Sequence, residues 1–318
     1  MKNIFVQYKE GCLPYAKVIS ALDDAFKLDI NCPIRHHHHL SVPGKKEATL
    51  LLMPAWLEGQ YLGVKQVSVF PSNSEAGLPG LNSIYILSCA KTGLPLAQFD
   101  GNIITARRTA SAAALGAKYL SRPDSKTLLM IGAGKVASQV VEAMSAVRDI
   151  EEIKVYDIYE ASAARLVEKI QTEMNIKASV VSKDDLPSTV AWADIVSCAT
   201  LSEEPLVLGE WVTPGTHVDL IGSFTPNMRE ADDALMQKAQ VFADFKEAAL
   251  TETGDFISPI KSGAITPDHI IGDFFSLSRG HHAGRKQFND PKNDISVFKA
   301  VGSSIEDLAT AMLWFDTI

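Results

Sequence analysis

Small residues follow an apolar run in the middle of the chain, where residues 127–131 lead into Gly132–Ala137, which reads GAGKVA. A glycine at position 132 allows a tight turn at the end of a strand, and Gly134 has no side chain to block a pyrophosphate. Ala137 lets the following helix pack close to a sheet, and the amino end of that helix offers free N–H groups and a positive dipole to phosphates. The pattern therefore predicts a dinucleotide-binding turn.

A carboxylate, Asp157, ends the next apolar segment, residues 153–157. At that place it would accept hydrogen bonds from the adenosine ribose and repel a 2′-phosphate. Ile158 and Tyr159 behind it offer no group that binds such a phosphate. We therefore expect NADH to be preferred, with NADPH use left open. The alternative is an ordinary aspartate in a surface turn.

Two further cofactor neighbours are expected at the ends of later apolar segments, Thr200 after 195–199 and Gly222 after 218–221. The carboxyl ends of parallel strands line the ligand crevice in a dinucleotide fold. Thr200 could equally cap the next segment, and Gly222 could simply turn the chain.

Three basic residues occupy distinctive settings in the amino-terminal part. Arg35 follows Cys-Pro-Ile, Lys65 interrupts an apolar strand, and Arg108 lies in a helix rich in alanine. Taken singly, each is more often a solvated surface charge. Lys65 is harder to explain in that way, because its strand is otherwise apolar.

The elements that must position these residues are of two kinds. Before residue 121, helices are predicted at 14–27 and 105–120, with strands at 48–53, 61–70 and 83–89 between glycine-containing turns. These indicate an α+β region with an antiparallel sheet. Later, short apolar strands alternate with helices, at 127–131, 153–157, 178–181, 195–199, 218–221 and 241–244. That alternation is typical of a doubly wound parallel sheet of the Rossmann type.

An amphipathic helix at 303–313 comes after this alternation has ended, so we assign it to the first region. The predicted fold class is therefore α/β. Residues 1–120 and 295–318 would form a substrate-binding domain, and residues 121–294 a dinucleotide-binding Rossmann domain.

The composition excludes several classes of protein. A net charge of −8 argues against nucleic-acid binding, which needs a basic face. The four cysteines are widely spaced and form no CxxC pair, so neither a disulfide framework nor a zinc site is expected. Without a signal-like amino terminus or a long apolar run, we expect a cytoplasmic protein with no membrane contact. The run His36–His39 invites a metal hypothesis, but adjacent side chains point in different directions, so no metal site is expected.

Several stretches together resemble the ornithine cyclodeaminase/μ-crystallin family. They are 62–73 (LGVKQVSVFPSN), 92–101 (TGLPLAQFDG), 105–120 (TARRTASAAALGAKYL), 129–136 (LMIGAGKV), 218–230 (VDLIGSFTPNMRE) and 297–307 (VFKAVGSSIED). The matches occur in one order and cover nearly the whole chain. The resemblance implies a homodimer built through the amino-terminal domain.

The resemblance also implies roles for single residues. Arg35, Lys65 and Arg108 match the residues that hold the substrate carboxylate, a group that guanidinium ions bind with paired hydrogen bonds. The cofactor positions carried over are Thr109, Ala133, Lys135, Val136, Asp157, Thr200 and Ser303, with Lys135 and Val136 acting mainly through the backbone. Many relatives have Thr or Ser at the position of Gly80, and nearby Ser83 could make that contact here.

Two positions depart from the cyclodeaminases. Those enzymes have an aspartate at the position of Phe224, which handles the substrate amine, and a lysine at the position of Met228. A phenyl ring cannot accept a proton, so ornithine cyclodeamination is disfavoured. An apolar Phe224 beside a carboxylate clamp suits a small cyclic imino acid, and the segment GSFTP resembles the ketimine reductase branch of the family.

We therefore predict an oxidoreductase that transfers hydride from NAD(P)H to C2 of a cyclic ketimine carboxylate. Δ1-Pyrroline-2-carboxylate would give L-proline, in proline metabolism or hydroxyproline degradation, and the six-membered homologue would give L-pipecolate. Lys65 is the expected catalytic residue: it would bind the substrate and help to keep the imine protonated, with a pKa lowered by burial or by the arginines. The alternatives are an alanine dehydrogenase, an ornithine cyclodeaminase, and a non-enzymatic, crystallin-like binding protein.

Overall fold

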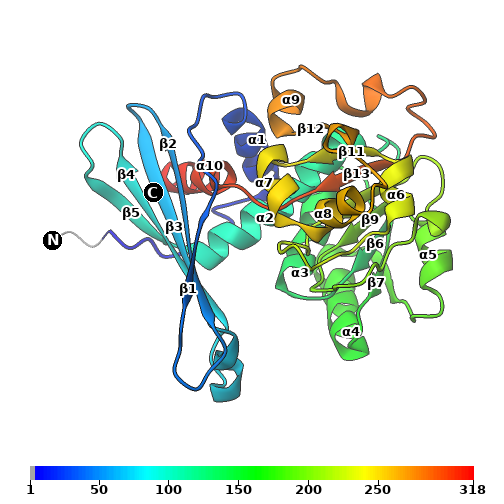
Figure 1. The fold of residues 1–318 in the computed structure, drawn as a ribbon, viewed down its shortest axis with the longest axis horizontal. Helices are drawn as coiled ribbons and strands as arrows, with labels where there is room; N and C mark the ends of the chain where they lie inside the picture. The colour runs from blue at the N-terminus through cyan, green and yellow to red at the C-terminus, as the bar shows by residue number, and fades with distance from the viewer. Residues whose placement is uncertain (1–3) are drawn as a thin grey trace. The chain divides into compact units, whose positions relative to one another are not determined.

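The computed structural model describes residues 4–318, apart from the side chain of Ser74. The chain divides into two compact units (Figure 1). The first holds the described residues up to Arg108 together with Ser303–Ile318, and the second is Thr109–Gly302. The α/β fold class predicted from the sequence is confirmed, with one antiparallel and one parallel sheet.

The first unit is built on a five-stranded antiparallel meander in the order β1-β2-β3-β4-β5. Its strands are β1 (His36–Leu40), β2 (Ala48–Leu57), β3 (Tyr61–Val69), β4 (Leu81–Cys89) and β5 (Pro95–Asp100). The turns at Gly59 and Gly93 take positive φ values of 67° and 72°, which L side chains rarely adopt. A short 3₁₀ helix, η1 (Pro71–Ala76), joins β3 to β4.

Two helices from opposite parts of the chain pack against each other, and one of them covers this sheet. Helix α1 (Tyr15–Ala25) buries its apolar stripe against α10 (Ser304–Phe315), and α10 also packs against β2, β3 and β4. Trp314 of α10 is 1% exposed and stacks on Phe99 of β5, with the ring centroids 4.7 Å apart. The helix that the sequence analysis assigned to the first region therefore completes the core of the first unit.

The second unit is built on an eight-stranded parallel sheet in the order β12-β11-β13-β10-β9-β6-β7-β8. Its strands are β6 (Thr127–Ile131), β7 (Glu152–Tyr156), β8 (Lys177–Val180), β9 (Ile195–Cys198), β10 (His217–Leu220), β11 (Gln240–Ala243), β12 (Ile270–Gly272) and β13 (Ser296–Lys299). Sequence order reverses between β6 and β9, and ligands of doubly wound sheets bind at such switch points.

Helices cover both faces of this sheet (Figure 1). They are α3 (Lys135–Ser145), α4 (Glu160–Lys169), α5 (Leu186–Trp192), α6 (Asp233–Lys238), α7 (Lys246–Glu252), α8 (Gly254–Lys261) and α9 (Phe274–Ser278), with the shorter turns η2 (Ile170–Met174), η3 (Gly209–Trp211), η4 (Pro267–His269) and η5 (Gly284–Gln287). Because both faces are covered, every residue of β9, β10 and β13 is buried.

Helix α2 (Gly101–Leu120) crosses the division between the units, which falls between Arg108 and Thr109. Its second half packs so closely on β13 that a Cβ at Gly116 would lie 2.6 Å from the ring of Phe298. This contact explains the small residues of the helix. The contacts divide the chain at 108/109 and 302/303, whereas the sequence analysis placed the domain boundaries at 120/121 and 294/295. The boundaries from the sequence stay predictions.

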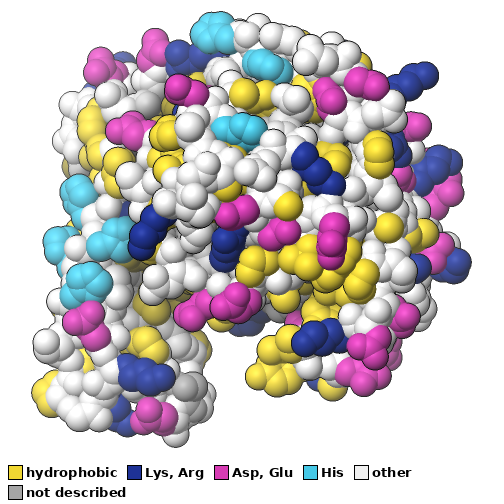
Figure 2. All heavy atoms as spheres, turned by 45° about the vertical axis from the view of Figure 1, so that its right-hand side comes forward, with side chains coloured by type: hydrophobic (Ala, Val, Ile, Leu, Met, Phe, Trp, Pro, Cys, Tyr) yellow, Lys and Arg dark blue, Asp and Glu magenta, His cyan; other side chains and the backbone are white. Residues whose placement is uncertain are grey.

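The histidine run forms the edge strand β1, and all five of its residues are exposed. Histidine side chains can be seen in groups at the surface in Figure 2. His36 and His38 point to the same side, with ring centroids 6.5 Å apart. Across residues 4–318, no group of three or more potential ligands is placed to hold a metal ion. In the same range no helix is long and apolar enough to cross a membrane.

Candidate active site

The turn between β6 and α3 has the geometry that its glycines predict. Gly132 has a φ of 98°, and a Cβ there would lie 2.6 Å from the carbonyl oxygen of Ala199. Gly134 is the N-cap of α3, and a Cβ at this residue would meet no atom within 4 Å. Gly132 is thus required by the fold, whereas Gly134 faces open space. The residues fit a pyrophosphate at the amino end of α3.

Asp157 lies directly after β7 and ties two loops together. Its Oδ2 accepts a hydrogen bond from the backbone N–H of Ala133 at 2.7 Å, and its Oδ1 accepts one from Tyr159 at 2.8 Å. A carboxylate has about four lone-pair directions, so Asp157 can still accept bonds from ribose hydroxyls.

Basic side chains stand beside this turn at positions that the sequence argument for NADH did not consider. A shallow pocket of about 240 Å³ is lined by Ala133, Gly134, Lys135, Ser138, Ser162, Arg165, Leu166 and Lys169. Within it, Arg165 donates a hydrogen bond to Ser162 Oγ at 2.9 Å. Arg and Ser are groups that bind phosphate, and Ser162 and Arg165 lie on α4, three and six residues beyond Tyr159.

Thr200 and Gly222 are held together by Glu230, a residue that the sequence analysis did not single out. Glu230 is fully buried; its Oε1 accepts hydrogen bonds from the backbone N–H of Thr200 at 2.8 Å and the hydroxyl at 2.9 Å. Its Oε2 accepts one from the N–H of Gly222 at 2.8 Å. A Cβ at Gly222 would collide with the carbonyl oxygen of Thr200, so close packing alone requires this glycine.

Glu230 is connected to a buried network of charged residues. Lys299 pairs with Asp255 at 3.1 Å, and Asp255 Oδ1 accepts the backbone N–H groups of Glu230 and Ala231. Burial is the main cause that raises the pKa of Glu230, and the charge of Lys299 opposes it. Burial also raises the pKa of Asp219 in β10 to about 7. This network positions the loops that follow β9 and β10.

In the first unit, two of the predicted cations meet two carboxylates from α10. Lys65 shares the buried face of β3 with Gly63 and Val67, and its side chain is 1% exposed. Its Nζ lies 2.7 Å from Asp307 Oδ1. Arg108 donates to the same oxygen at 3.1 Å and to Glu306 Oε2 at 3.2 Å. Both carboxylates are fully buried.

The pKa of Lys65 is lowered to about 8, chiefly by burial. Asp307 raises it, while the positive charges of Arg108 and then Arg35 lower it. Arg35 therefore acts on the same cluster, and the expected cause of the shift agrees with the structure. A lysine with this pKa can donate a proton near neutral pH.

The first turn of α10 carries the residues that contact this cluster. Ser303 is the N-cap of α10, and its Oγ accepts the backbone N–H of Glu306 at 3.5 Å. Among the described residues, Asp307 Oδ2 has no hydrogen-bond partner although it is buried. Glu306 and Asp307 were missed by sequence reasoning, although a serine followed by a glutamate three positions later is a helix-start signal.

The remaining candidate residues lie outside these charged clusters. Ser83 is buried in β4 and donates its hydroxyl to Asn102 Oδ1 at 2.8 Å, in a pocket of about 360 Å³. Thr109 is buried in α2, within the second unit. Phe224, after β10, is 52% exposed and follows Ser223, which is fully buried.

By unit, the first holds Arg35, Lys65, Ser83, Arg108 and Ser303, and the second holds Thr109, Gly132–Ala137, Asp157, Thr200, Gly222 and Phe224. The cations and the dinucleotide turn are thus assembled on separate sheets.

The sequence model of the ornithine cyclodeaminase/mu-crystallin family matches residues 10–318. The chain belongs to this family. The resemblance stated from the sequence is therefore confirmed. A curated relative, the Δ1-pyrroline-2-carboxylate reductase of Paracoccus denitrificans, is 41% identical over 269 residues, which are 84% of this chain and 83% of the relative.

Two solved structures are also similar to this chain. The Δ1-pyrroline-2-carboxylate reductase of Thermococcus litoralis, solved with NADH and L-proline, has 34% identity and a TM-score of 0.87, covering 97% of this chain and 94% of that one. An archaeal alanine dehydrogenase dimer with bound NAD has 29% identity and a TM-score of 0.89, covering 100% of this chain and 96% of that one.

Proposed function

We propose that this protein reduces a cyclic ketimine carboxylate with a nicotinamide cofactor, and that Δ1-pyrroline-2-carboxylate is its substrate and L-proline its product. The six-membered homologue, which gives L-pipecolate, is a second candidate substrate. The observation that carries the proposal is Lys65, a buried lysine with a pKa near 8 beside Arg108. The similarity to two Δ1-pyrroline-2-carboxylate reductases supports it.

The proposed roles follow from charge. Arg108, with Arg35, would orient the substrate carboxylate, so that an encounter becomes a positioned attack. Lys65 would hydrogen-bond the imine nitrogen and hold a proton there, because a neutral C=N accepts hydride poorly. Asp307 Oδ1 keeps the ammonium group in place. When bound, the cofactor supplies the hydride, and Gly132–Ala137 with Asp157, Thr200 and Gly222 are its proposed holders.

An assay of NADH oxidation tests the proposal. The purified protein would be given Δ1-pyrroline-2-carboxylate, Δ1-piperideine-2-carboxylate, or pyruvate with ammonia. Turnover of a cyclic imine well above that of pyruvate is expected. Faster turnover of pyruvate with ammonia would favour the alanine dehydrogenase alternative, to which the archaeal dimer is similar. NADH binding without any turnover would favour a crystallin-like binding protein.

We expect imine reduction to fall as the pH rises through about 8, where Lys65 loses its proton. The protonated lysine is the active form, so kcat/KM should be flat below this pH and drop about tenfold per pH unit above it. Lys65→Arg keeps the charge but does not titrate in this range, so it should be slower and lack this descending limb. A limb near pH 8 that persists in Lys65→Arg would assign the titration to another group.

We expect a higher kcat/KM with NADH than with NADPH, because Asp157 lies where a 2′-phosphate would be repelled. Arg165 and Ser162 give that phosphate partial compensation. Arg165→Ala should therefore weaken the use of NADPH and leave NADH nearly unchanged. Steady-state kinetics with both cofactors check this, and a clear NADPH preference in the unaltered protein would contradict it.

We also propose that the protein is a cytoplasmic homodimer formed through its first unit, in proline metabolism such as hydroxyproline degradation. The family resemblance and the archaeal alanine dehydrogenase dimer support the dimer. The spacing of the cysteines supports the location.

A further inference from the structure

A cavity of about 930 Å³ lies within the second unit, and its lining shares no residue with the dinucleotide turn, Gly132–Ala137. Its lining comes from the end of α2, from Arg148, which follows α3, and from the stretch between α9 and β13. These segments precede β6, β7 and β13, so the cavity lies at the amino edge of the parallel sheet. The dinucleotide turn follows β6 and lies at the carboxyl edge.

The lining is strongly basic in a chain whose net charge is −8. Its charged members are Lys118, Arg122, Arg148, Arg285, Lys286 and Lys292 on the positive side and Asp124 on the negative side. Arg122 is paired with Asp124 and with Asp194. The ammonium groups of Lys286 and Lys292 have no ion-pair partner in the part of the chain that the structure describes.

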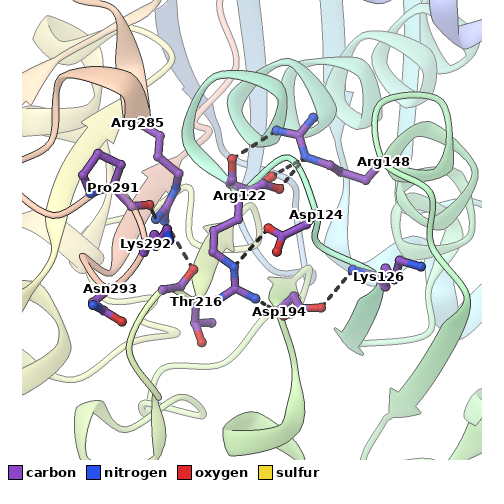
Figure 3. A network of polar contacts seen from close by, with 12 residues as sticks. Arg122, Asp124, Lys126, Arg148, Asp194, Thr216, Arg285, Pro291, Lys292 and Asn293 are labelled. Atoms are coloured by element: carbon purple, nitrogen blue, oxygen red, sulfur yellow. Dashed lines mark hydrogen bonds and ion pairs between the residues drawn. The ribbon is translucent and has the colours of Figure 1, made fainter.

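Two guanidinium groups in this lining are held by neutral oxygens. Arg148 donates to carbonyl oxygens at the end of α2, including those of Ala117 and Lys118 at 2.9 and 3.0 Å. Arg285 is 4% exposed and donates to the carbonyl oxygen of Pro291 at 2.8 Å and to Ser296 Oγ at 3.2 Å. Within residues 4–318, neither pairs with a carboxylate. Figure 3 shows Arg122, Arg148 and Arg285 coming from three segments, each with its guanidinium group at oxygen partners of its own.

The positive charge of this lining shifts the pKa values of neighbouring groups. The pKa of Arg285 is lowered to about 10, first by burial and then by the charge of Arg122, while Asp294 opposes this shift. The pKa of buried His217 is held well below its usual range, first by burial and then by Arg285 and Arg148. The hydrogen bonds satisfy the N–H donors, but they leave the positive charge without a full counter-charge.

We propose that this cavity binds an organic anion that carries several phosphate groups, of the nucleoside triphosphate class. A multiply charged ligand matches the surplus of basic side chains, which a single carboxylate would leave mostly uncompensated. Tyr119, Pro123 and Leu277 add apolar surface for an organic body. The volume lies within the range of small-molecule sites, about 300–1,000 Å³. Carbonyl oxygens already hold the guanidinium groups in place, so these side chains lose little conformational entropy when a ligand binds.

The test is calorimetric titration of the full chain with GTP and, separately, with inorganic tripolyphosphate. Saturating NADH is present so that the dinucleotide turn is blocked. The double variant Lys286→Gln/Lys292→Gln removes two exposed charges from the lining. Lys183→Gln/Lys261→Gln, which removes two exposed charges elsewhere in the second unit, is the matched control. Thermal unfolding and imine reduction should be unchanged in both.

GTP is expected to bind once per chain, more weakly as salt rises, and at least about tenfold more weakly in the lining variant than in the control. Tripolyphosphate should bind less tightly than GTP, because it lacks the organic body. The proposal is overturned if GTP does not bind to the NADH-saturated protein, if both double variants lose binding equally, or if tripolyphosphate binds as tightly as GTP. None of these outcomes bears on imine reduction, so the proposed function is tested separately.

Discussion

Replacing Arg108 by alanine should lower kcat/KM for the cyclic imine by about 30- to 1,000-fold, which corresponds to about 2–4 kcal/mol. Replacing Arg107 should change it by only a few-fold. Adjacent residues on a helix point about 100° apart. Arg108 reaches Asp307 and Glu306, whereas Arg107 donates to the Tyr8 hydroxyl at 3.0 Å and lies over the ring of Tyr15. Steady-state kinetics of the two variants make the comparison.

Loss of folding must be separated from loss of substrate binding in this test. Removing Arg108 leaves buried carboxylates short of a partner, which costs about 3–5 kcal/mol in comparable buried pairs. Arg108→Lys keeps the charge and gives up the paired hydrogen bonds, so it should remain folded and still raise KM. Thermal unfolding of all three variants is the control. Equal losses of kcat/KM in Arg107→Ala and Arg108→Ala would show that the carboxylate is bound elsewhere.

The purified protein should reduce Δ1-pyrroline-2-carboxylate with NADH and form no proline from ornithine and NAD. Cyclodeamination requires proton transfers at the substrate nitrogens, which the family resemblance assigns to an aspartate at the position of Phe224. A phenyl ring has no lone pair for them, and such acid–base help is typically worth about 10²–10⁴-fold. Reduction of a preformed imine needs only the hydride, a carboxylate clamp and a proton source. Proline and ammonia are measured in parallel incubations.

Two variants sharpen this second test. Phe224→Leu keeps an apolar side chain, so it should retain imine reduction. Phe224→Asp introduces the missing carboxylate on a side chain that is already 52% exposed, where it is tolerated without burial of a charge. Proline and ammonia released from ornithine by the unaltered protein, at a rate that matches imine reduction, would refute the assignment.

Most of the parallel sheet could be predicted because its central strands are buried on both faces and read as short apolar runs. Strand β5 was missed although its residues alternate between buried and less buried, and three other missed strands lack a clear apolar run. Strand β1 is an exposed edge strand made mostly of histidine, and β12 has only three residues. Strand β13 begins with a serine that bonds His217, so its apolar run is short. The division between the units could not be predicted either, because it falls inside one continuous helix, α2.

The sequence identified those site residues whose type is unusual for their local structure. Gly132 needs positive φ, and Lys65 interrupts an apolar strand, so both stood out in the sequence. Glu230 and Asp307 did not, because a buried acid and a solvated acid look the same in a single sequence. Only three-dimensional contacts show that Glu230 joins two loops and that Asp307 accepts hydrogen bonds from two cations.

The position of α10 in the chain sets the order in which the protein can be completed during translation. Arg108 and Glu306 are 198 residues apart, and the whole of the second unit lies between them. A nascent chain therefore carries Lys65 and Arg108 well before their carboxylates exist. Burying two unpaired cations is strongly unfavourable, so the first sheet should stay open until α10 emerges and docks on α1 and β3. The second unit can thus fold first during translation, and the buried cluster of Lys65, Arg108 and Asp307 forms last.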